Sequence, residues 1–239
     1  MATILIGLDD TDNATSRGTG HLARQLLADL ARRGLRPISV TRHQLPLDPR
    51  IPYTSHNSGA CVAVEGGDGA DSTKVAFDFV AERAADGSDP GVCIAEAGML
   101  PDEVLAFGRR AAEEVVEMAE ALDVARAAGV ALRPLGGTGL GVIGALASVG
   151  LRAGGDDGRF IELPGLRELV GRLGAEGFER VGIRLEHTGT HWPGPDDAYE
   201  TFGWVRPRLL GGRAVLPVKW SEQQDAWVPV DRKRSRPLE

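Results

Sequence analysis

Three acidic side chains, Asp9, Asp10 and Asp12, stand within four positions of one another, directly after a short apolar run. Carboxylates this close repel one another unless a counter-charge lies between them. A divalent cation supplies that charge, and Mg²⁺ prefers a few carboxylates together with phosphate oxygens. The cluster therefore predicts a Mg²⁺ site that also holds a polyphosphate. The plainer interpretation is an acidic turn whose Asp side chains cap backbone groups.

A short glycine-containing segment, Arg17-Gly18-Thr19-Gly20-His21, follows the acidic cluster and opens a predicted helix. The first turn of a helix presents unpaired N–H groups, and glycines let a phosphate approach them. We therefore predict that Arg17, Gly18 and Gly20 contact phosphate. Thr19 is either a phosphate ligand, a phosphoryl acceptor or a plain N-cap.

A second glycine-rich turn, at residues 135–141, precedes an apolar helix at residues 142–149. Such a turn is suited to cradling phosphates. No Gly-Lys-Ser/Thr follows it, so it is not a Walker A motif. It contains the spacing G-x-G-x-x-G, but no clear strand precedes it, which argues against a dinucleotide site. The alternative is close helix packing through glycine. The predicted phosphate-contacting residues of this turn are Gly136, Gly137, Thr138, Gly139 and Gly141.

Two polar loops are weaker candidates. Residues 53–60 form a polar segment that enters a buried strand, and His56 and Asn57 are its predicted substrate-binding residues. His187 and His191 are four positions apart, but the Gly and Pro around them predict a loop, which leaves a metal or substrate role open.

Composition limits the classes of function. The chain has 239 residues, a net charge of −7 and a pI of about 5.3, so a whole-surface electrostatic grip on nucleic acid is not indicated. Cys61 and Cys93 lie in apolar runs and are expected to be buried, reduced and inert. The longest strongly apolar stretch, residues 140–151, is too short for a bilayer, and no signal peptide is seen. We expect a cytoplasmic protein without membrane contact.

The hydrophobic pattern predicts the elements that position these residues. Apolar runs predict strands at residues 3–8, 36–40, 60–65 and 92–96. Helical spacing predicts helices at residues 21–32, 74–85 (with a start signal at Ser72) and 102–128. Residues 44–58 contain three prolines and form an irregular connection. The pattern favours an α/β (α+β) fold, with a mixed-sheet nucleotide-binding domain over residues 1–155.

The character of the chain changes after Gly154–Gly158. Residues 159–163, 166–173 and 180–186 predict a strand-helix-strand unit, and residues 202–206, 213–218 and 226–230 predict further strands. We predict a small C-terminal α+β domain over residues 156–239 whose basic tail, from Asp231 to Arg236, is a disordered terminus. The oligomeric state is left open.

Four segments, taken in order, resemble a known family. IGLDDTD (6–12), RGTGHLA (17–23), LDPRIPYTSHNSGA (47–60) and GLGVIGALASVG (139–150) resemble the N-terminal, kinase-like part of archaeal tRNA(Ile) agmatidine synthetase, over about residues 3–165. That family joins agmatine to an anticodon cytidine, and its kinase-like part uses Mg²⁺ and ATP to phosphorylate the base and a Thr of its own. The resemblance implies ATP and Mg²⁺ as cofactors.

By position, the resemblance assigns Asp9, Asp10 and Asp12 to the family's Mg²⁺-ATP cluster and Thr19 to the phosphorylated Thr. Asn57 and Gly59 match a polar strand-entry loop, and residues 139–144 match the Gly-rich helix start. Two segments depart from the family's pattern. Gly18-Thr19-Gly20 replaces Cys-Thr-Thr, and Leu140 stands in place of an expected Arg.

The sequence thus predicts a Mg²⁺-dependent, ATP-binding phosphotransferase or ligase-like enzyme whose acceptor is a small molecule or RNA. No zinc ribbon is present and no oligonucleotide-binding barrel is evident, so an RNA acceptor would need a partner to hold it. One alternative is a haloacid-dehalogenase-like phosphatase that uses Asp10 and Asp12, with Asp156-Asp157 as a later Mg²⁺ site. The other is a non-catalytic nucleotide-binding module.

Overall fold

The computed structural model of the chain describes residues 2–51, 56–66 and 69–230, with the backbone alone at 69–72. The predicted start signal at Ser72, the polar residues Tyr53–Ser55 and the basic tail after Val230 therefore lie outside the described side chains. Within the described residues, no helix has the length and apolarity needed to cross a membrane.

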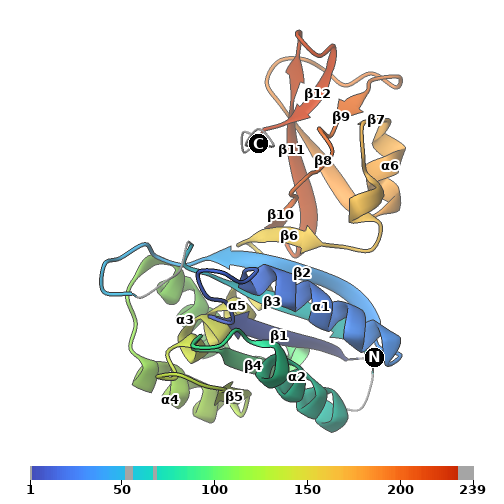
Figure 1. Cartoon of the computed structure of the whole chain (residues 1–239). Helices are drawn as coiled ribbons and strands as arrows, with labels where there is room; N and C mark the ends of the chain where they lie inside the picture. Colours follow the sequence, from blue (N-terminus) through green and yellow to red (C-terminus); the bar gives the residue numbers. More distant parts are fainter. Residues whose placement is uncertain (1, 52–55, 67–68, 231–239) are drawn as a thin grey trace.

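The N-terminal part of the chain is built around a four-stranded antiparallel unit (Figure 1). Its elements in chain order are β1 (Thr3–Asp9), α1 (Thr19–Arg32), β2 (Arg36–Gln44), β3 (Ser58–Glu65), α2 (Gly69–Arg83) and β4 (Gly91–Glu96). The spatial order β4-β1-β3-β2 makes this a ferredoxin-like β-α-β-β-α-β unit. Since every neighbouring pair is antiparallel, the last residues of β1 and β2 and the first residues of β3 and β4 lie side by side at the same end of the strands.

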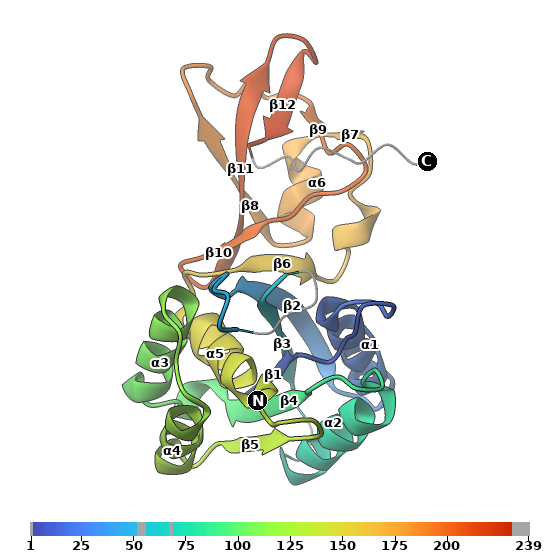
Figure 2. The ribbon, with the colours of Figure 1, turned by 60° about the vertical axis from the view of Figure 1, so that its left-hand side comes forward.

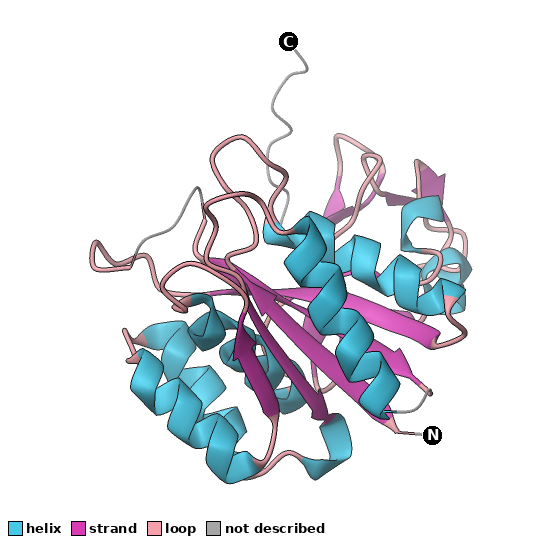
Figure 3. Cartoon of the chain, turned by 60° about the horizontal axis from the view of Figure 1, so that its bottom comes forward, coloured by secondary structure: helices cyan, strands magenta, loops and turns pink. Residues whose placement is uncertain are grey.

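Helices cover both faces of this sheet (Figures 2 and 3). On one face lie α1 and α2, and on the other α5 (Gly141–Gly154) together with α3 (Asp102–Glu113) and α4 (Met118–Ala128). A short 3-10 turn, η1 (Ala97–Met99), follows β4, and β5 (Ala131–Pro134) pairs with β4 at the edge of the sheet.

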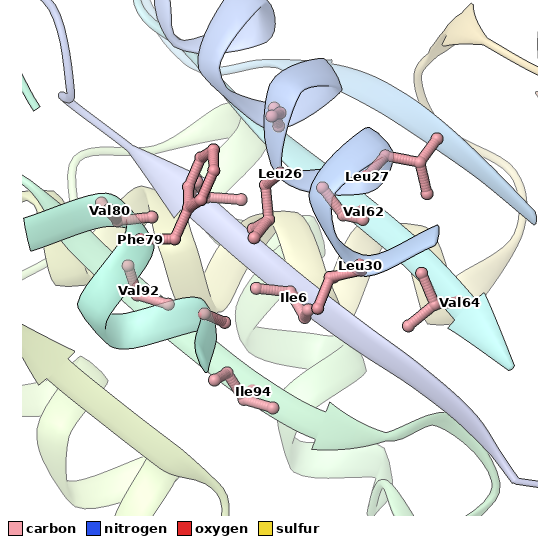
Figure 4. Close-up of a cluster of buried hydrophobic side chains, with 14 of the residues drawn as sticks. Ile6, Leu26, Leu27, Leu30, Val62, Val64, Phe79, Val80, Val92 and Ile94 are labelled. Carbon is pink, nitrogen blue, oxygen red and sulfur yellow. The ribbon is translucent and has the colours of Figure 1, made fainter. Parts of the chain in front are cut away.

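The alternation of side chains along β1 and β3 divides the interior into two apolar clusters. Ile6 and Val62 point towards Leu26 and Leu30 of α1 (Figure 4). Their neighbours Leu5, Cys61 and Cys93 point the other way, towards α3, α4 and α5. Both cysteines are buried and free, and burial raises the pKa of the Cys61 thiol to about 12, so the expectation that they are reduced and inert fits their positions.

The C-terminal part has its own cluster around Trp227. Its elements are β6 (Arg159–Glu162), η2 (Leu166–Glu168), β7 (Arg172–Leu173), α6 (Ala175–Arg180), β8 (Ile183–Thr188), β9 (Tyr199–Glu200), β10 (Arg208–Leu210), β11 (Arg213–Ser221) and β12 (Ala226–Pro229). β8 runs parallel to β11 and β9 parallel to β12, whereas the other pairs are antiparallel. The predicted fold class, α+β with a mixed sheet, is confirmed.

Strand β6 joins the two parts, because it pairs with β2 on one side and with β10 on the other. Its side chains alternate accordingly. Phe160 belongs to the C-terminal cluster, and Ile161 packs against the cluster beneath α1. A division between residues 155 and 156 stays a prediction, and the separate clusters of buried side chains support it.

Several predicted elements differ from the structure. The expected single helix over residues 102–128 is two helices, broken where Glu114 is extended. The break falls at Glu114-Val115-Val116-Glu117, directly after Glu113, where clustered like charges and two β-branched residues weaken a helix. A strand does precede the second glycine turn, since β5 ends at Pro134.

The C-terminal expectations needed further correction. The helix expected at residues 166–173 is the short η2 followed by β7, because Gly171 adopts a left-handed φ of +78° that ends helical geometry. The strand expected at residues 202–206 is irregular, with Phe202 and Gly203 both at positive φ. His187 is in strand β8 rather than a loop.

Candidate active site

The acidic cluster lies where β1 ends, at the end of the strands where β1 and β2 finish and β3 and β4 begin. β1 ends at Asp9, and Asp10 turns the chain with a φ of +49°, a left-handed conformation that Asp tolerates better than most residues. Backbone bonds hold the turn against the segment before β4, since Asp89 N–H donates to the Asp10 carbonyl (3.1 Å) and Ala85 N–H to the Thr11 carbonyl (3.0 Å). The three carboxylates are therefore presented by a tethered turn.

Asp12 caps helix α1 from the preceding loop. Its Oδ1 accepts hydrogen bonds from the Thr19 backbone N–H (3.0 Å) and the Thr19 hydroxyl (2.8 Å). The N-cap residue itself is Gly18, which has no side chain to cap the helix. The interpretation of Thr19 as a plain N-cap is therefore wrong, because Thr19 is the first residue inside the helix.

The Thr19 hydroxyl is buried and has two protein partners. It donates to Asp12 and accepts hydrogen bonds from the Thr11 hydroxyl (3.1 Å) and the Thr11 N–H (3.2 Å). A hydroxyl that donates to a carboxylate at 2.8 Å has the geometry in which the carboxylate accepts its proton during nucleophilic attack. Asp12 thus suits both a capping role and a base role.

Asp9 lies against the first turn of helix α5. A Cβ added at Gly144 would stand 1.8 Å from Asp9 Oδ2, so only glycine at position 144 lets the carboxylate and the helix approach this closely. Burial is the main reason that the pKa of Asp9 is raised to about 7, and the negative charges of Asp10 and Asp12 raise it further. A backbone hydrogen bond from Asp10 opposes the shift.

The pKa of Asp10 is raised to about 6, first by burial and then by the negative charges of Asp89 and Asp12. Asp9 and Asp10 are thus acidic groups whose charge the surrounding protein does not compensate, and a bound cation would compensate it. Within the described parts of the chain, no three His, Cys, Asp or Glu side chains stand together as a preformed metal site. A shared Mg²⁺ would therefore need phosphate oxygens among its ligands, which is its usual manner of binding.

The second glycine turn is occupied by a protein carboxylate. Asp89 accepts hydrogen bonds from the Gly139 N–H (2.6 Å), the Leu140 N–H (3.2 Å) and the Thr138 hydroxyl. Gly137 and Gly139 adopt left-handed φ values of +59° and +89°. The turn thus docks the start of α5 against β4, which favours the helix-packing interpretation for these amides.

A cavity of about 530 Å³, here called the acidic cavity, opens between the end of β1, the loop before β3 and the start of α5. It brings together Asp9, Asp10, Asp12, Thr19, His56, Asn57 and Gly141 from the predicted site. Gly18 and Gly20 line a neighbouring cavity instead. Of the remaining predicted residues, Arg17, Gly136, Gly137, Thr138 and Gly139 line neither.

Within this cavity, Asn57 has a structural bond. Its side-chain amide donates to the Pro46 carbonyl (2.7 Å), and its backbone carbonyl accepts a hydrogen bond from the Leu45 N–H (2.9 Å). Sequence reasoning missed Arg50, the single basic residue among the described cavity-lining side chains apart from His56, and it missed Glu114 and Glu117. Arg50 stands in the third resembling segment, so its position there was the available signal.

The acids proposed for a phosphatase lie elsewhere. Asp157 Oδ1 is 2.9 Å from His43 Nδ1, and Asp156 Oδ1 accepts a hydrogen bond from the Gly211 N–H (2.7 Å). Both residues line the neighbouring cavity and not the acidic one. This placement gives no support to Asp156 and Asp157 as metal ligands beside Asp10.

Comparison with known proteins bears on the N-terminal part. A ferredoxin-like domain with acids at the end of its first strand is the class that the fold and the site define. No protein-family model matches the chain. The chain is 34% identical over 152 residues to the isoleucine-tRNA 2-agmatinylcytidine synthetase of Pyrococcus horikoshii and 33% identical over 155 residues to that of Methanocorpusculum labreanum.

These matches cover 61% and 62% of this chain, in its N-terminal part, and 35% of each relative. The chain thus spans about a third of the length of the curated relatives it matches. The expected resemblance is confirmed for this part of the chain.

Solved structures agree. The agmatidine synthetase in complex with its isoleucine tRNA and ATP superposes with a TM-score of 0.55 at 26% identity, over 63% of this chain and 36% of that one. The complex with the same tRNA, AMPCPP and agmatine gives 0.54 at 25% identity, over 62% and 36%.

Proposed function

We propose that this chain is a Mg²⁺-dependent, ATP-using enzyme of the phosphotransferase or ligase-like kind, related to the kinase-like part of the agmatidine synthetases. The observation that carries the proposal is the uncompensated carboxylate pair Asp9 and Asp10 in a cavity between the starts of α1 and α5. This cavity lies in the part of the chain that is similar to proteins crystallised with ATP.

The residues fit a nucleotide with its metal. Asp9 and Asp10 would bind Mg²⁺ together with phosphate oxygens of ATP, and the bound ion would neutralise charge on the phosphates. The positive end of the α1 dipole, beside Thr19, favours a negative group in the same cavity. Positioning and electrostatics supply most of the catalysis in phosphoryl transfer, so no further reactive group is needed.

For transfer to the protein itself, Thr19 is the acceptor that the resemblance indicates. The Thr19 hydroxyl oxygen would form a bond to the γ-phosphorus as the bond to the β-phosphate oxygen breaks, ADP would leave, and Asp12 would take the hydroxyl proton. Thr11, which donates to the same oxygen, would hold it in place.

The final acceptor is a small molecule or RNA. The relatives are named for 2-agmatinylcytidine synthesis on an isoleucine tRNA, and one of their structures holds agmatine. For this chain, RNA modification is proposed only with a partner that supplies RNA binding, because its own net charge is −7. A cytoplasmic location stays a prediction.

Incubation with ATP labelled in the γ-phosphate, with and without Mg²⁺, tests the proposal. We expect Mg²⁺-dependent label on the protein or in phosphate, and a loss of about 100-fold or more in Asp10→Asn, because a metal-binding carboxylate is removed. Asp123→Asn is the matched control, since Asp123 is exposed and pairs only with Arg126 among the described residues.

The outcomes separate the candidate functions. ATP binding without turnover would instead select a non-catalytic nucleotide-binding module. Label on Asp10, or turnover of a generic phosphomonoester, would select a phosphatase. The absence of ATP binding would reject the proposal.

A further inference from the structure

A second, larger cavity of about 880 Å³, here called the basic cavity, lies where the two parts of the chain meet. Its wall combines α1 and β2 of the N-terminal part with β6 and residues 204–210 of the C-terminal part. It shares Asp12, Thr19, His56 and Ser58 with the acidic cavity, so the two cavities adjoin at Thr19. The alignments with the matched relatives lie in the N-terminal part, and the residues on the C-terminal side of this cavity lie outside them.

The side chains around this cavity concentrate positive charge in an acidic protein. Six arginines line it against three aspartates, although the whole chain carries a net charge of −7. The six are Arg24, Arg42, Arg159, Arg167, Arg206 and Arg208. Such a local excess in a concave site attracts anions and raises their local concentration.

Arg206 is the least compensated of these arginines. It is half-buried, and its guanidinium lies 4.0 Å from the centroid of the Trp204 ring. Within the described residues it makes no hydrogen bond or ion pair, so its N–H groups are available to an anion in the cavity. Burial lowers its pKa, and so do the positive charges of Arg42 and Arg159, because like charges disfavour the charged form.

Neighbouring groups hold three of the other arginines in position. Arg42 Nε donates to the Ser58 hydroxyl (2.8 Å), at the border with the acidic cavity. Arg167 donates to Glu162 (2.8 Å) and lies 5.9 Å from the centroid of the Trp204 ring. Arg24 is 3.9 Å from the same Glu162. Trp204 and Glu162 thus act as positioning residues for guanidinium groups that face one space.

We propose that the basic cavity is the acceptor site and that it binds a small phosphorylated molecule. The assignment as an acceptor site rests on the proposed function, because the bound molecule would lie beside Thr19 and the carboxylates that would bind Mg²⁺ and ATP. The binding of a phosphorylated molecule does not depend on that function. Guanidinium groups match phosphate through paired N–H···O bonds, and several converge here from both parts of the chain.

The dimensions and charge favour a small molecule over a nucleic-acid strand. A volume of about 880 Å³ is within the range of small-molecule sites. A long polyanion would in addition meet a surface whose net charge is negative, and its affinity depends on many phosphate contacts. The positive charge here is confined to the cavity rather than spread along a face.

Isothermal titration calorimetry on the full chain tests the site. The probes are ribose 5-phosphate, cytidine 5′-monophosphate and inorganic pyrophosphate, each added after saturation with Mg²⁺ and a non-hydrolysable ATP analogue, so that the acidic cavity is filled. We expect at least one probe to bind the wild-type chain. Arg206→Gln and, separately, Arg42→Gln should weaken it about tenfold or more, the effect of losing about one charged hydrogen bond.

Arg109→Gln is the matched control, because Arg109 is exposed on α3 and lines neither cavity. It should bind the probe as the wild type does, and all three variants should bind the ATP analogue unchanged. Circular dichroism confirms that each variant is folded. Since Arg206 has no hydrogen-bond partner in the described protein, its replacement breaks no such contact.

The outcomes are separable. Equal binding of the probe by Arg206→Gln and the wild type, or no binding of any probe, overturns the inference. Binding of a short single-stranded RNA but of no free phosphorylated compound overturns it in favour of RNA. If a probe binds and Arg206→Gln weakens its binding, but the ATP analogue does not bind, the proposed ATP chemistry fails and the phosphate site stands.

Discussion

Asp9 shows how one buried carboxylate links the stability of this protein to its proposed chemistry. Its pKa is raised to about 7 because it is pressed against α5 at Gly144 and surrounded by other acids. In the unfolded chain its pKa is near the ordinary value of 3.8. At a pH between these two pKa values, the folded state holds a proton on Asp9 that the unfolded state has lost.

The first prediction concerns pH. Since the folded state binds more protons from about pH 4 to about pH 7, the free energy of unfolding should fall as pH rises through that range. Asp9→Asn should remove much of this dependence and stabilise the metal-free protein at pH 8 by on the order of 1–3 kcal/mol. Thermal unfolding from pH 5 to pH 8 measures it.

Asp123→Asn serves as the control and should follow the wild-type profile, because Asp123 is exposed. A wild-type stability that rises steadily from pH 5 to pH 8 would show that the Asp9 carboxylate is compensated in the folded protein.

The second prediction separates the capping and chemical roles of Asp12. Asp12→Ala removes both bonds from Thr19 and should lower the free energy of unfolding by about 1 kcal/mol, the usual value of a helix cap. Asp12→Asn keeps the acceptor oxygen, so its stability should stay near that of the wild type. It loses the base, so label transferred to Thr19 should fall strongly.

Thermal unfolding and mass spectrometry of the labelled protein read out the two roles. Full labelling in Asp12→Asn would limit Asp12 to the cap.

At the scale of elements, α5 packs directly on the sheet because glycines stand where the backbones meet. A Cβ at Gly7 would lie 2.0 Å from the Ala145 carbonyl, and one at Gly141 would lie 2.1 Å from the Asp89 carbonyl. These contacts bring the helix backbone directly onto β1 and the start of β4. The glycine-rich turn at residues 135–141, for which the sequence left a phosphate cradle and close packing open, therefore has a clear packing role at Gly141.

The third prediction tests that packing. Gly144→Ala places a methyl group in the space of the Asp9 carboxylate, so we expect a loss of about 1–3 kcal/mol in stability and weakened ATP binding. Gly154→Ala, in the same helix, meets open space and should leave the stability unchanged or slightly raised. Thermal unfolding and ATP titration measure both. A wild-type profile for Gly144→Ala would mean that Asp9 and α5 separate at no cost.

At the scale of the whole molecule, β6 connects two separate apolar clusters. The fourth prediction is that a chain ending at Leu163 unfolds cooperatively, because it retains the pairing of β6 with β2. A chain ending at Gly155 should be less stable and more prone to aggregation, since the edge of β2 is then unpaired. Calorimetry and light scattering compare the two. Loss of cooperative unfolding in the longer chain would show that the two parts fold as one unit.

The sequence alone determined the features that depend on neighbouring residues. The acids at residues 9–12 follow a strand, Thr19 starts a helix, and the strands and helices up to residue 100 fall close to their predicted positions. Local patterns suffice there because alternation and helical spacing act over a few residues. They failed at residues 102–128 and 166–173, where charges and glycines interrupt an otherwise helical pattern.

Only the tertiary structure decided which distant charges meet. Asp89 fills the turn at Gly139, fifty residues away, and Arg206 faces Arg42 across the junction of the two parts. Such contacts depend on strand order and on the pairing of β6 with both β2 and β10. Electrostatic energies depend on distance through space, which the separation of residues along the chain does not specify.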